Sequence, residues 1–219
     1  ITLTNQHVGG SLTQALTLTN TATNDGFSES LDASIAAATG TATASGSFSL
    51  LAAGSSDSSS LTVGVNTTTA GAKSGTATIT LTSDGTGTSG LGNTSLTSQT
   101  VNVSGDVYRL ASASAHSPEP ITLTNQHVGG SLTQALTLQN TAASDGYSEK
   151  LDASIGSATG TATTNSGSFS LLAAGSTNNS SLTVGVDTAS AGHKSGTATI
   201  SLTSDGTGTS GLGNTSLTS

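Results

Sequence analysis

The chain has 219 residues, of which 7% are charged and 2% are aromatic, and its formal net charge is -8. It contains no cysteine, so it can hold neither a disulfide nor a thiolate-bound zinc ion. Its four lysine and arginine residues are too few to form the basic face that nucleic acid requires. No apolar run approaches the roughly 20 residues that span a bilayer. We therefore expect neither a nucleic-acid partner nor a membrane segment in these residues.

A repeat of about one domain's length organises the sequence. Residues 1–20 read ITLTNQHVGGSLTQALTLTN, and residues 121–140 differ from them only where Gln139 replaces Thr19. Later stretches return in the same order after a one-residue insertion before Gly167. The spacing is too long for a solenoid repeat and is typical of an independent domain. We predict two tandem domains, residues 1–111 and 121–219, joined by a Ser/Ala/Pro linker at residues 112–120.

The second copy lacks the closing stretch QTVNVSGDVYRLA that the first copy contains. The sequence also begins without an initiator methionine or signal peptide. From both observations we expect these residues to be a piece of a longer protein, with the last strand missing from the second domain.

Apolar residues alternate with polar ones in short runs along each copy. In chain order, the first copy has such runs at Leu12, Leu16 and Leu18, at Leu61, Val63 and Val65, at Ala77, Ile79 and Leu81, and at Val101 and Val103. A period of two with threonine between the apolar positions predicts strands that bury one face. Residues 31–44 are rich in alanine and could begin a helix, but the threonines and glycine within them favour a strand.

Glycine-rich and Asn/Asp-rich turns separate these runs, so the sequence predicts an all-β fold. We expect tandem immunoglobulin-like β-sandwich domains of about seven to eight strands each. A barrel, a β-helix and a disordered segment are the less favoured alternatives. The predicted core is thin and consists of Leu, Val, Ile and Ala, with Phe27, Phe48 and Phe169 as its bulky members.

The only two prolines of the chain, Pro118 and Pro120, lie at the end of the predicted linker. Proline fixes its own φ and keeps the preceding residue extended. We therefore favour a linker that sets the angle between successive domains over a passive tether.

The histidines are the candidate catalytic groups, but no nucleophile motif accompanies them in the sequence. His7 and its repeat His127 stand beside a Gly-Gly turn with no nucleophile motif, whereas His116 and His193 are not repeated. We predict no catalytic residue, no cofactor-binding residue and no enzymatic activity.

Carboxylates offer the strongest alternative, a structural calcium ion. Three lie within eight residues of each other and recur in the second copy: Asp25, Glu29 and Asp32, then Asp145, Glu149 and Asp152. Oxygen ligands of this kind suit Ca²⁺, yet no calcium-loop motif accompanies them. We therefore assign no metal ligand and prefer surface and turn carboxylates.

Residues 75–111, GTATITLTSDGTGTSGLGNTSLTSQTVNVSGDVYRLA, resemble the closing segment of the choice-of-anchor D type domain. That family is an immunoglobulin-like module repeated in large secreted bacterial proteins. The resemblance implies an extracellular or cell-surface array of sandwich domains. The second copy departs from the pattern, because it lacks the VSGDVYRLA stretch.

These observations predict a structural repeat region of a long extracellular bacterial surface protein, acting as an adhesin stalk or spacer. The alternative is a subunit of a self-assembling filament or surface layer, joined by strand complementation between chains. An enzyme or sugar-binding module is a third and weaker hypothesis. The expected partners are neighbouring repeats of the same chain and, in a filament, other copies of it.

Overall fold

The computed structural model describes residues 1–218, with every side chain in that range except that of Ala37. Its described residues form strands and loops without a helix, so the predicted all-β fold is confirmed. They divide into two compact units, Ile1–Val107 and Tyr108–Ser219. Among the described residues, no helix is long and apolar enough to cross a bilayer.

The first unit has ten described strands, most of them short. They are β1 (Gln6–His7), β2 (Thr13–Ala15), β3 (Leu18–Thr19), β4 (Ser30–Ala38), β5 (Ala42–Ser45), β6 (Ser47–Leu51), β7 (Ser56–Asp57), β8 (Thr62–Val65), β9 (Gly71–Asp84) and β10 (Thr94–Tyr108).

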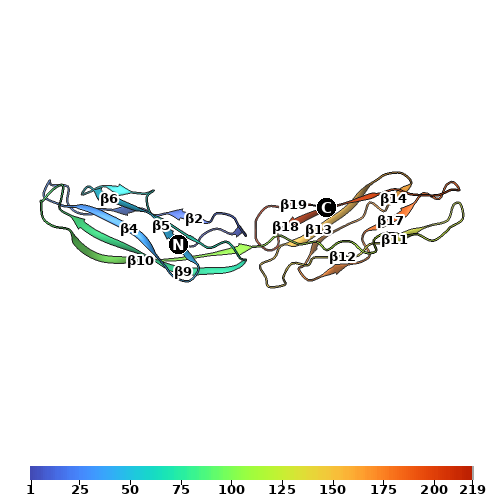
Figure 1. Cartoon of the computed structure of the whole chain (residues 1–219), viewed down its shortest axis with the longest axis horizontal. Helices are drawn as coiled ribbons and strands as arrows, with labels where there is room; N and C mark the ends of the chain where they lie inside the picture. Colours follow the sequence, from blue (N-terminus) through green and yellow to red (C-terminus); the bar gives the residue numbers. More distant parts are fainter. Residues whose placement is uncertain (219) are drawn as a thin grey trace. The chain divides into compact units, whose positions relative to one another are not determined.

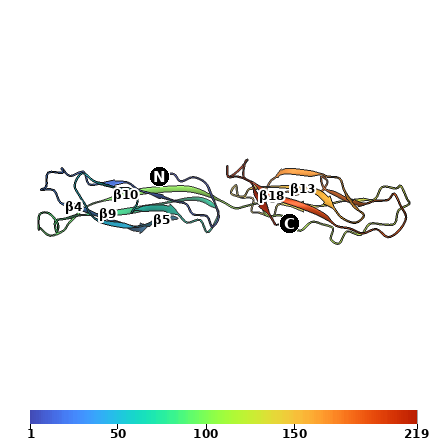
Figure 2. The ribbon, with the colours of Figure 1, turned by 90° about the horizontal axis from the view of Figure 1, so that it is seen from above.

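Two layers of these strands enclose the core of the first unit. One layer is a five-stranded sheet in the order β1-β10-β9-β4-β6, and the other contains the sheet β2-β8-β5 and the pair β3-β7. Figures 1 and 2 show β4, β9 and β10 running beside one another. The alternating residues Leu61, Val63, Ala77, Ile79 and Leu81 are all buried between the layers. This arrangement agrees with the predicted sandwich, because alternate side chains of a strand point to one face.

The second unit repeats this arrangement with nine described strands. They are β11 (Thr133–Ala135), β12 (Leu138–Gln139), β13 (Lys150–Ala158), β14 (Ala162–Thr164), β15 (Ser168–Leu172), β16 (Thr177–Asn178), β17 (Thr183–Val186), β18 (Ala198–Asp205) and β19 (Thr215–Leu217).

The main sheet of the second unit has the order β15-β13-β18-β19, facing the sheet β11-β17-β14 and the pair β12-β16. Its core contains Leu136, Leu138, Ala153, Ile155, Leu182 and Val184.

Both units have more strands than the seven to eight expected from the sequence. The reason is that a single extended run changes its partner. For example, β2 pairs with β8, whereas β3, which follows after two residues, pairs with β7. The run is therefore divided into two short strands.

The expectation that Phe27 belongs to the core is wrong, because 89% of its surface is exposed. Phe27 follows the turn at Asp25, whose Oδ1 accepts a hydrogen bond from the Phe27 backbone N–H. Phe48 and Phe169 are partly buried and pack against the cores of their units, as predicted.

The units divide between Val107 and Tyr108, before the predicted linker. Residues beyond that point already pair with the second unit. The backbone N–H of Arg109 donates to the carbonyl of Tyr147, and that of Ser117 donates to the carbonyl of Thr137. Residues 109–117, which include most of the predicted linker, therefore form part of the second unit.

Candidate functional site

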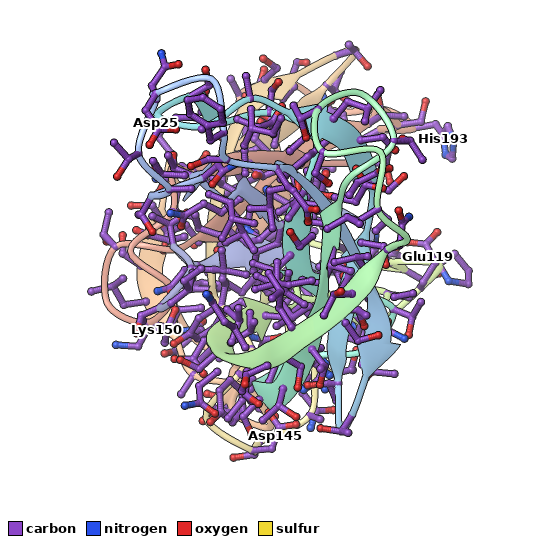
Figure 3. The ribbon with its side chains drawn as sticks, turned by 90° about the vertical axis from the view of Figure 1, so that its left-hand side faces the viewer. Asp25, Glu119, Asp145, Lys150 and His193 are labelled. Carbon is purple, nitrogen blue, oxygen red and sulfur yellow. The ribbon has the colours of Figure 1, made fainter. Side chains whose placement is uncertain are left out.

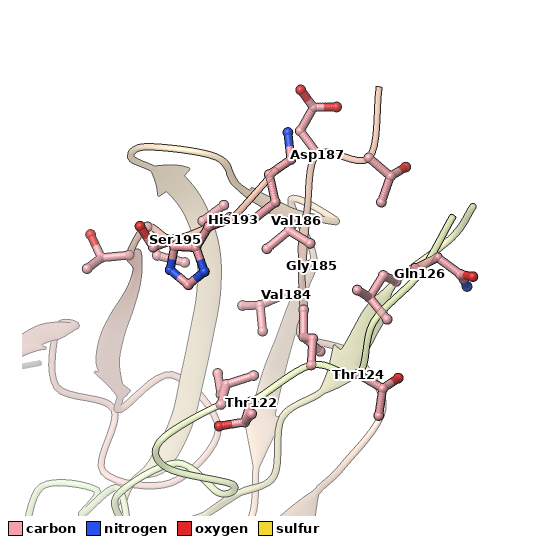
Figure 4. A pocket seen from close by; sticks show the side chains of 18 of the residues that line it. Thr122, Thr124, Gln126, Val184, Gly185, Val186, Asp187, His193 and Ser195 are labelled. Carbon is pink, nitrogen blue, oxygen red and sulfur yellow. The ribbon is translucent and has the colours of Figure 1, made fainter. Parts of the chain in front are cut away.

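A groove of about 870 Å³ opens into the core of the second unit. We call it the strand groove. One side consists of residues 121–128, the other of residues 190–198, and its floor includes Val184 and Val186. In Figure 4, Thr122, Thr124 and Gln126 follow one side, His193 and Ser195 stand on the other, and Val184, Gly185 and Val186 lie between them.

The corresponding place in the first unit is filled by β10. On one side β10 pairs with β9, and the register places Val101, Val103 and Val107 opposite Ala77, Gly75 and Gly71. On its other side, the backbone N–H of Leu3 donates to the carbonyl of Ser104 at 2.8 Å, and the N–H of Ser104 donates to the carbonyl of Ile1 at 3.0 Å. Thus β10 lies between the first residues of the unit and β9.

Core positions next to the strand groove are less buried than their counterparts in the first unit. Leu3, Leu12, Val65, Ala77, Ile79 and Leu81 are all buried. Their counterparts are only partly buried, namely Leu123, Leu132, Val186, Ala198, Ile200 and Leu202. Leu61 and its counterpart Leu182 are both fully buried. Elsewhere the difference is reversed, since Leu16 and Leu18 are partly buried and their counterparts Leu136 and Leu138 are buried.

The backbone along one side of the groove also differs between the units. Residues 71–76 belong to β9, but their counterparts 192–197 are not strand, and β18 begins only at Ala198. In both units the edge of this segment that faces away from the groove is hydrogen-bonded. In the second unit, the backbone N–H of Thr161 donates to the carbonyl of Ser195 at 2.9 Å. Within residues 1–218, the backbone groups of Lys194 and Gly196 make no hydrogen bond. In an extended chain, the backbone groups of successive residues point to opposite edges. Because Ser195 bonds to the edge that faces Thr161, the backbone groups of Lys194 and Gly196 point toward the groove.

Charged side chains stand at the rim of the groove rather than on its floor. His193 is exposed and replaces Ala72 of the first unit. The ammonium group of Lys194 donates to Ser190 Oγ at 2.9 Å, and Asp187 Oδ1 accepts from the Ala189 N–H. His116 Nε2 lies 3.1 Å from Glu119 Oε2. The groove therefore offers an apolar floor with backbone donors and acceptors along its edge.

The carboxylates that could have formed a calcium site instead serve separate hydrogen bonds. Asp25 closes the turn before Phe27, and Asp32 Oδ1 accepts from the Leu50 N–H at 2.7 Å. Glu29 accepts from the hydroxyls of Ser83 and Ser89. Those two bonds, the Ser83 bond first, lower the pKa of Glu29.

The corresponding carboxylates of the second unit accept equivalent hydrogen bonds. Glu149 is fully buried and accepts from Ser204 Oγ at 2.6 Å and from Ser210 Oγ at 2.5 Å. Asp152 Oδ1 accepts from the Leu171 N–H at 2.6 Å. No three acidic or histidine side chains among the described residues cluster as a metal site would. Figure 3 shows Asp25 and Asp145 at the outside of their units.

Among residues 1–218, Asp145 forms an ion pair that has no counterpart at Asp25. Arg109 Nη1 lies 2.6 Å from Asp145 Oδ2, and it also donates to Ser148 Oγ at 3.0 Å. The hydrogen bond from Arg109 is the main reason that the pKa of Asp145 is lowered. The ring of Tyr108 packs against Tyr147, with centroids 5.6 Å apart. These contacts attach residues 108 and 109 to the second unit.

Sequence reasoning missed a pair of buried asparagines. Asn140 is fully buried, its Nδ2 donates to the carbonyls of Glu149 and Leu172, and its Oδ1 accepts from the Ala142 N–H. Asn20 makes the equivalent bonds in the first unit. Each asparagine ends a run of alternating leucines, LTLTN in the first unit and LTLQN in the second. An asparagine at the end of such a run is the sequence feature that could have indicated these buried side chains.

The four histidines that were considered and rejected as catalytic groups lie in different settings. His116 pairs with Glu119, His193 stands at the groove rim, and the His7 and His127 N–H groups bond the preceding glutamine side chains.

No protein-family model matches the chain, and no curated protein matches it either. The resemblance to the choice-of-anchor D domain therefore gains no support from these comparisons.

Two solved structures align with most of the chain at low similarity. One is a chain of a chaperone–tip adhesin complex of CFA/I fimbriae biogenesis, with a TM-score of 0.27, 9% identity, and coverage of 92% of this chain and 95% of that chain. The other is the collagen-binding domain of the Erysipelothrix rhusiopathiae surface protein RspB, with a TM-score of 0.15, 9% identity, and coverage of 98% and 86%. Such low similarity carries no argument about this chain's function.

Proposed function

We propose that the chain is a structural repeat region of a long extracellular bacterial surface protein and acts as an adhesin stalk or spacer. The observation that carries this proposal is the repetition of one all-β unit with a nearly identical sequence. Length grows when such units are added, and each unit keeps its own core. The acidic, Ser- and Thr-rich composition suits an exposed, soluble polymer.

The contacts of the polar side chains support a structural role. Asn20, Glu29, Asp32 and Asp57 bind backbone or hydroxyl groups of their own unit. Their counterparts in the second unit make equivalent bonds. Side chains used in this way stabilise loops and strand ends, and a spacer needs no other chemistry.

Two measurements test the stalk proposal. Antibodies raised against the two-unit protein should label intact cells of the source organism, and protease treatment of those cells should remove the label. In sedimentation equilibrium, the purified protein should remain a monomer over a wide concentration range. Labelling only after cell lysis would contradict the surface location.

A second candidate function is a subunit of a self-assembling filament or surface layer. It rests on the same repetition of one all-β unit, with strand pairing joining one chain to the next. Growth of the purified protein into fibres, observed by electron microscopy, would support this function and contradict a monomeric stalk.

A further inference from the structure

We propose that a bulge in β6, repeated in β15, prevents these edge strands from pairing with the same strands of a second copy of the chain. Both strands stand at the end of their sheet's strand order. Among residues 1–218, β6 pairs only with β4, and β15 pairs only with β13. Such an edge presents backbone donors and acceptors to which another chain can add. Each molecule has two of these edges, one in each unit.

The sequence of the two edge strands is prone to such pairing. Both read SFSLL and lie in the stretch GSFSLLAAGS, which is identical at residues 46–55 and 167–176. The stretch contains neither a charged residue nor proline, the side chains that natural proteins place on edge strands to block addition. Uncharged segments without proline and with high β-propensity are typical of strands that assemble between chains. A different feature must therefore protect these edges.

The register of β6 against β4 contains one extra residue. Phe48 and Leu51 both pack against the core, although they are three residues apart, and their partners in β4 are only two residues apart. A regular strand would turn two such side chains to opposite faces. Asp32 therefore faces two residues of β6, Ser49 and Leu50, which is a β-bulge. The same irregularity recurs between β13 and β15.

The extra residue adopts a backbone conformation that leucine rarely takes. Leu50 has a φ of 56° and Leu171 a φ of 57°, in the left-handed region that is costly for a residue with a Cβ atom. The Leu50 N–H donates to Asp32 Oδ1 at 2.7 Å, and the Leu171 N–H donates to Asp152 Oδ1 at 2.6 Å. In each unit a carboxylate of the neighbouring strand thus holds the bulge in place.

The bulge leaves little regular edge for a second chain. An antiparallel ladder needs consecutive extended residues on both strands. In β6 only residues 47–49 precede the bulge, and the strand ends at Leu51 directly after Leu50. Leu50 is not extended, and its N–H is bound to Asp32. An incoming strand therefore finds too few consecutive hydrogen-bonding positions to pair stably.

Deletion of Leu50 together with Leu171 tests the proposal. The shortened strands read SFSL, in which Phe48 and Leu51 regain the alternation of a regular strand. Both edges then become flat. In analytical ultracentrifugation at increasing concentration, we expect the average mass of the deletion variant to exceed that of the parent protein by about twofold or more, because identical edges pair with one another.

A glycine variant separates the bulge from the exposed leucine. Leu50→Gly with Leu171→Gly keeps the extra residue, and glycine adopts a positive φ without strain. We expect this variant to associate no more than the parent protein and to be at least as stable in urea. Association of the glycine variant to the same degree as the deletion variant would overturn the proposal, since the leucine side chain and not the bulge would then keep the chains apart.

A second pair of variants decides the question if the deletion variant does not fold. Asp32→Ala with Asp152→Ala removes the acceptors that hold the bulge, so that both leucines can return to an extended φ. We expect association above that of the parent protein, with slower amide exchange at residues 47–51 and 168–172 in the associated form. Ser34→Ala with Ser154→Ala, two residues further along the same strands, is the matched control and should behave like the parent.

Two results would overturn the proposal. One is a deletion variant and an aspartate variant that both fold and both associate no more than the parent protein. The other is association without added protection in β6 and β15, which would assign the contact to another surface.

Discussion

Asp57 and Asn178 close the same turn in the two units with different chemistry. Asp57 Oδ1 accepts from the N–H groups of Ser59 and Ser60, and Oδ2 accepts from Ser60 Oγ. Asn178 Oδ1 accepts from the corresponding N–H groups, while its Nδ2 donates to Ser181 Oγ. Only the aspartate can be protonated, so the turn in the first unit alone responds to acid.

The pKa of Asp57 is lowered, mainly by the backbone hydrogen bond from Ser60 and then by its hydroxyl. Its stabilising effect is therefore complete above the unfolded pKa and is lost as the pH falls below about 4. We expect Asp57→Asn to reduce the loss of stability of the first unit between pH 7 and pH 3, and Asn178→Asp to increase that loss in the second unit. Calorimetric melting at both pH values measures this. An unchanged pH dependence in Asp57→Asn would contradict it.

Asp25 and Asp145 form a second matched pair. Each accepts a hydrogen bond from the N–H two residues later, at 2.9 and 3.0 Å, but only Asp145 also binds Arg109. We expect Asp145→Ala to destabilise its unit slightly more than Asp25→Ala does, because a partly exposed ion pair contributes little. Urea unfolding of both variants measures the difference. A difference that persists in 1 M NaCl would show that the ion pair is not its source.

At the level of elements, β9 extends over 14 residues, whereas β18 has 8, although the two segments have almost the same sequence. The longer strand has β10 on its second edge, and the shorter one borders the strand groove. The neighbouring strand, and not the local sequence, therefore decides how far this strand extends.

This difference predicts contrasting hydrogen exchange within one molecule. Amides on the β10 side of residues 71–77, such as those of Lys73 and Gly75, should exchange slowly, because they pair with β10. The corresponding amides of Lys194 and Gly196 should exchange faster by orders of magnitude. Exchange followed by mass spectrometry of the two peptides tests this with a matched sequence. Equal protection would mean that residues 192–197 pair with a strand in solution.

Strand positions were predictable where a run alternates and buries one face. Residues 61–65 and 77–81 were recognised in this way; residues 62–65 form β8, and residues 77–81 lie within β9. The role of residues 109–117 was not predictable, because it depends on distant partners. The Ala111 N–H donates to Ser204 Oγ, and the Ser112 N–H donates to Asn140 Oδ1. A Ser- and Ala-rich stretch has the composition of a linker whether or not such partners exist.

The strand groove was only half predictable. The repeat shows that the second copy lacks the residues that match 99–107. The sequence does not show which segments would flank that strand, since residues 121–128 and 190–198 are far apart along the chain. Only the folded structure brings them together as the two sides of one groove.

For the whole molecule, two separate cores predict two unfolding transitions. The second unit should melt first, because six of its core positions are only partly buried. Leu61 and Leu182 are fully buried equivalents. We expect Leu61→Ala to lower only the melting temperature of the upper transition, and Leu182→Ala only that of the lower transition. Each substitution should reduce the free energy of unfolding of its own unit by about 2–5 kcal/mol. Differential scanning calorimetry distinguishes them. A single transition lowered equally by both substitutions would mean that the units unfold together.

The attachment of residues 109–117 to the second unit matters to anyone who cuts or recombines the gene. The repeat in the amino-acid sequence begins at Ile121, so a comparison of the two copies would place a cloning boundary there. An expressed fragment that starts at Ile121 would lose the Arg109–Asp145 ion pair and the bonds to Ser204 and Asn140. A fragment that starts at Tyr108 keeps them. Chimaeras of such repeats should therefore be joined at the Val107–Tyr108 peptide bond, where each product retains its own set of contacts.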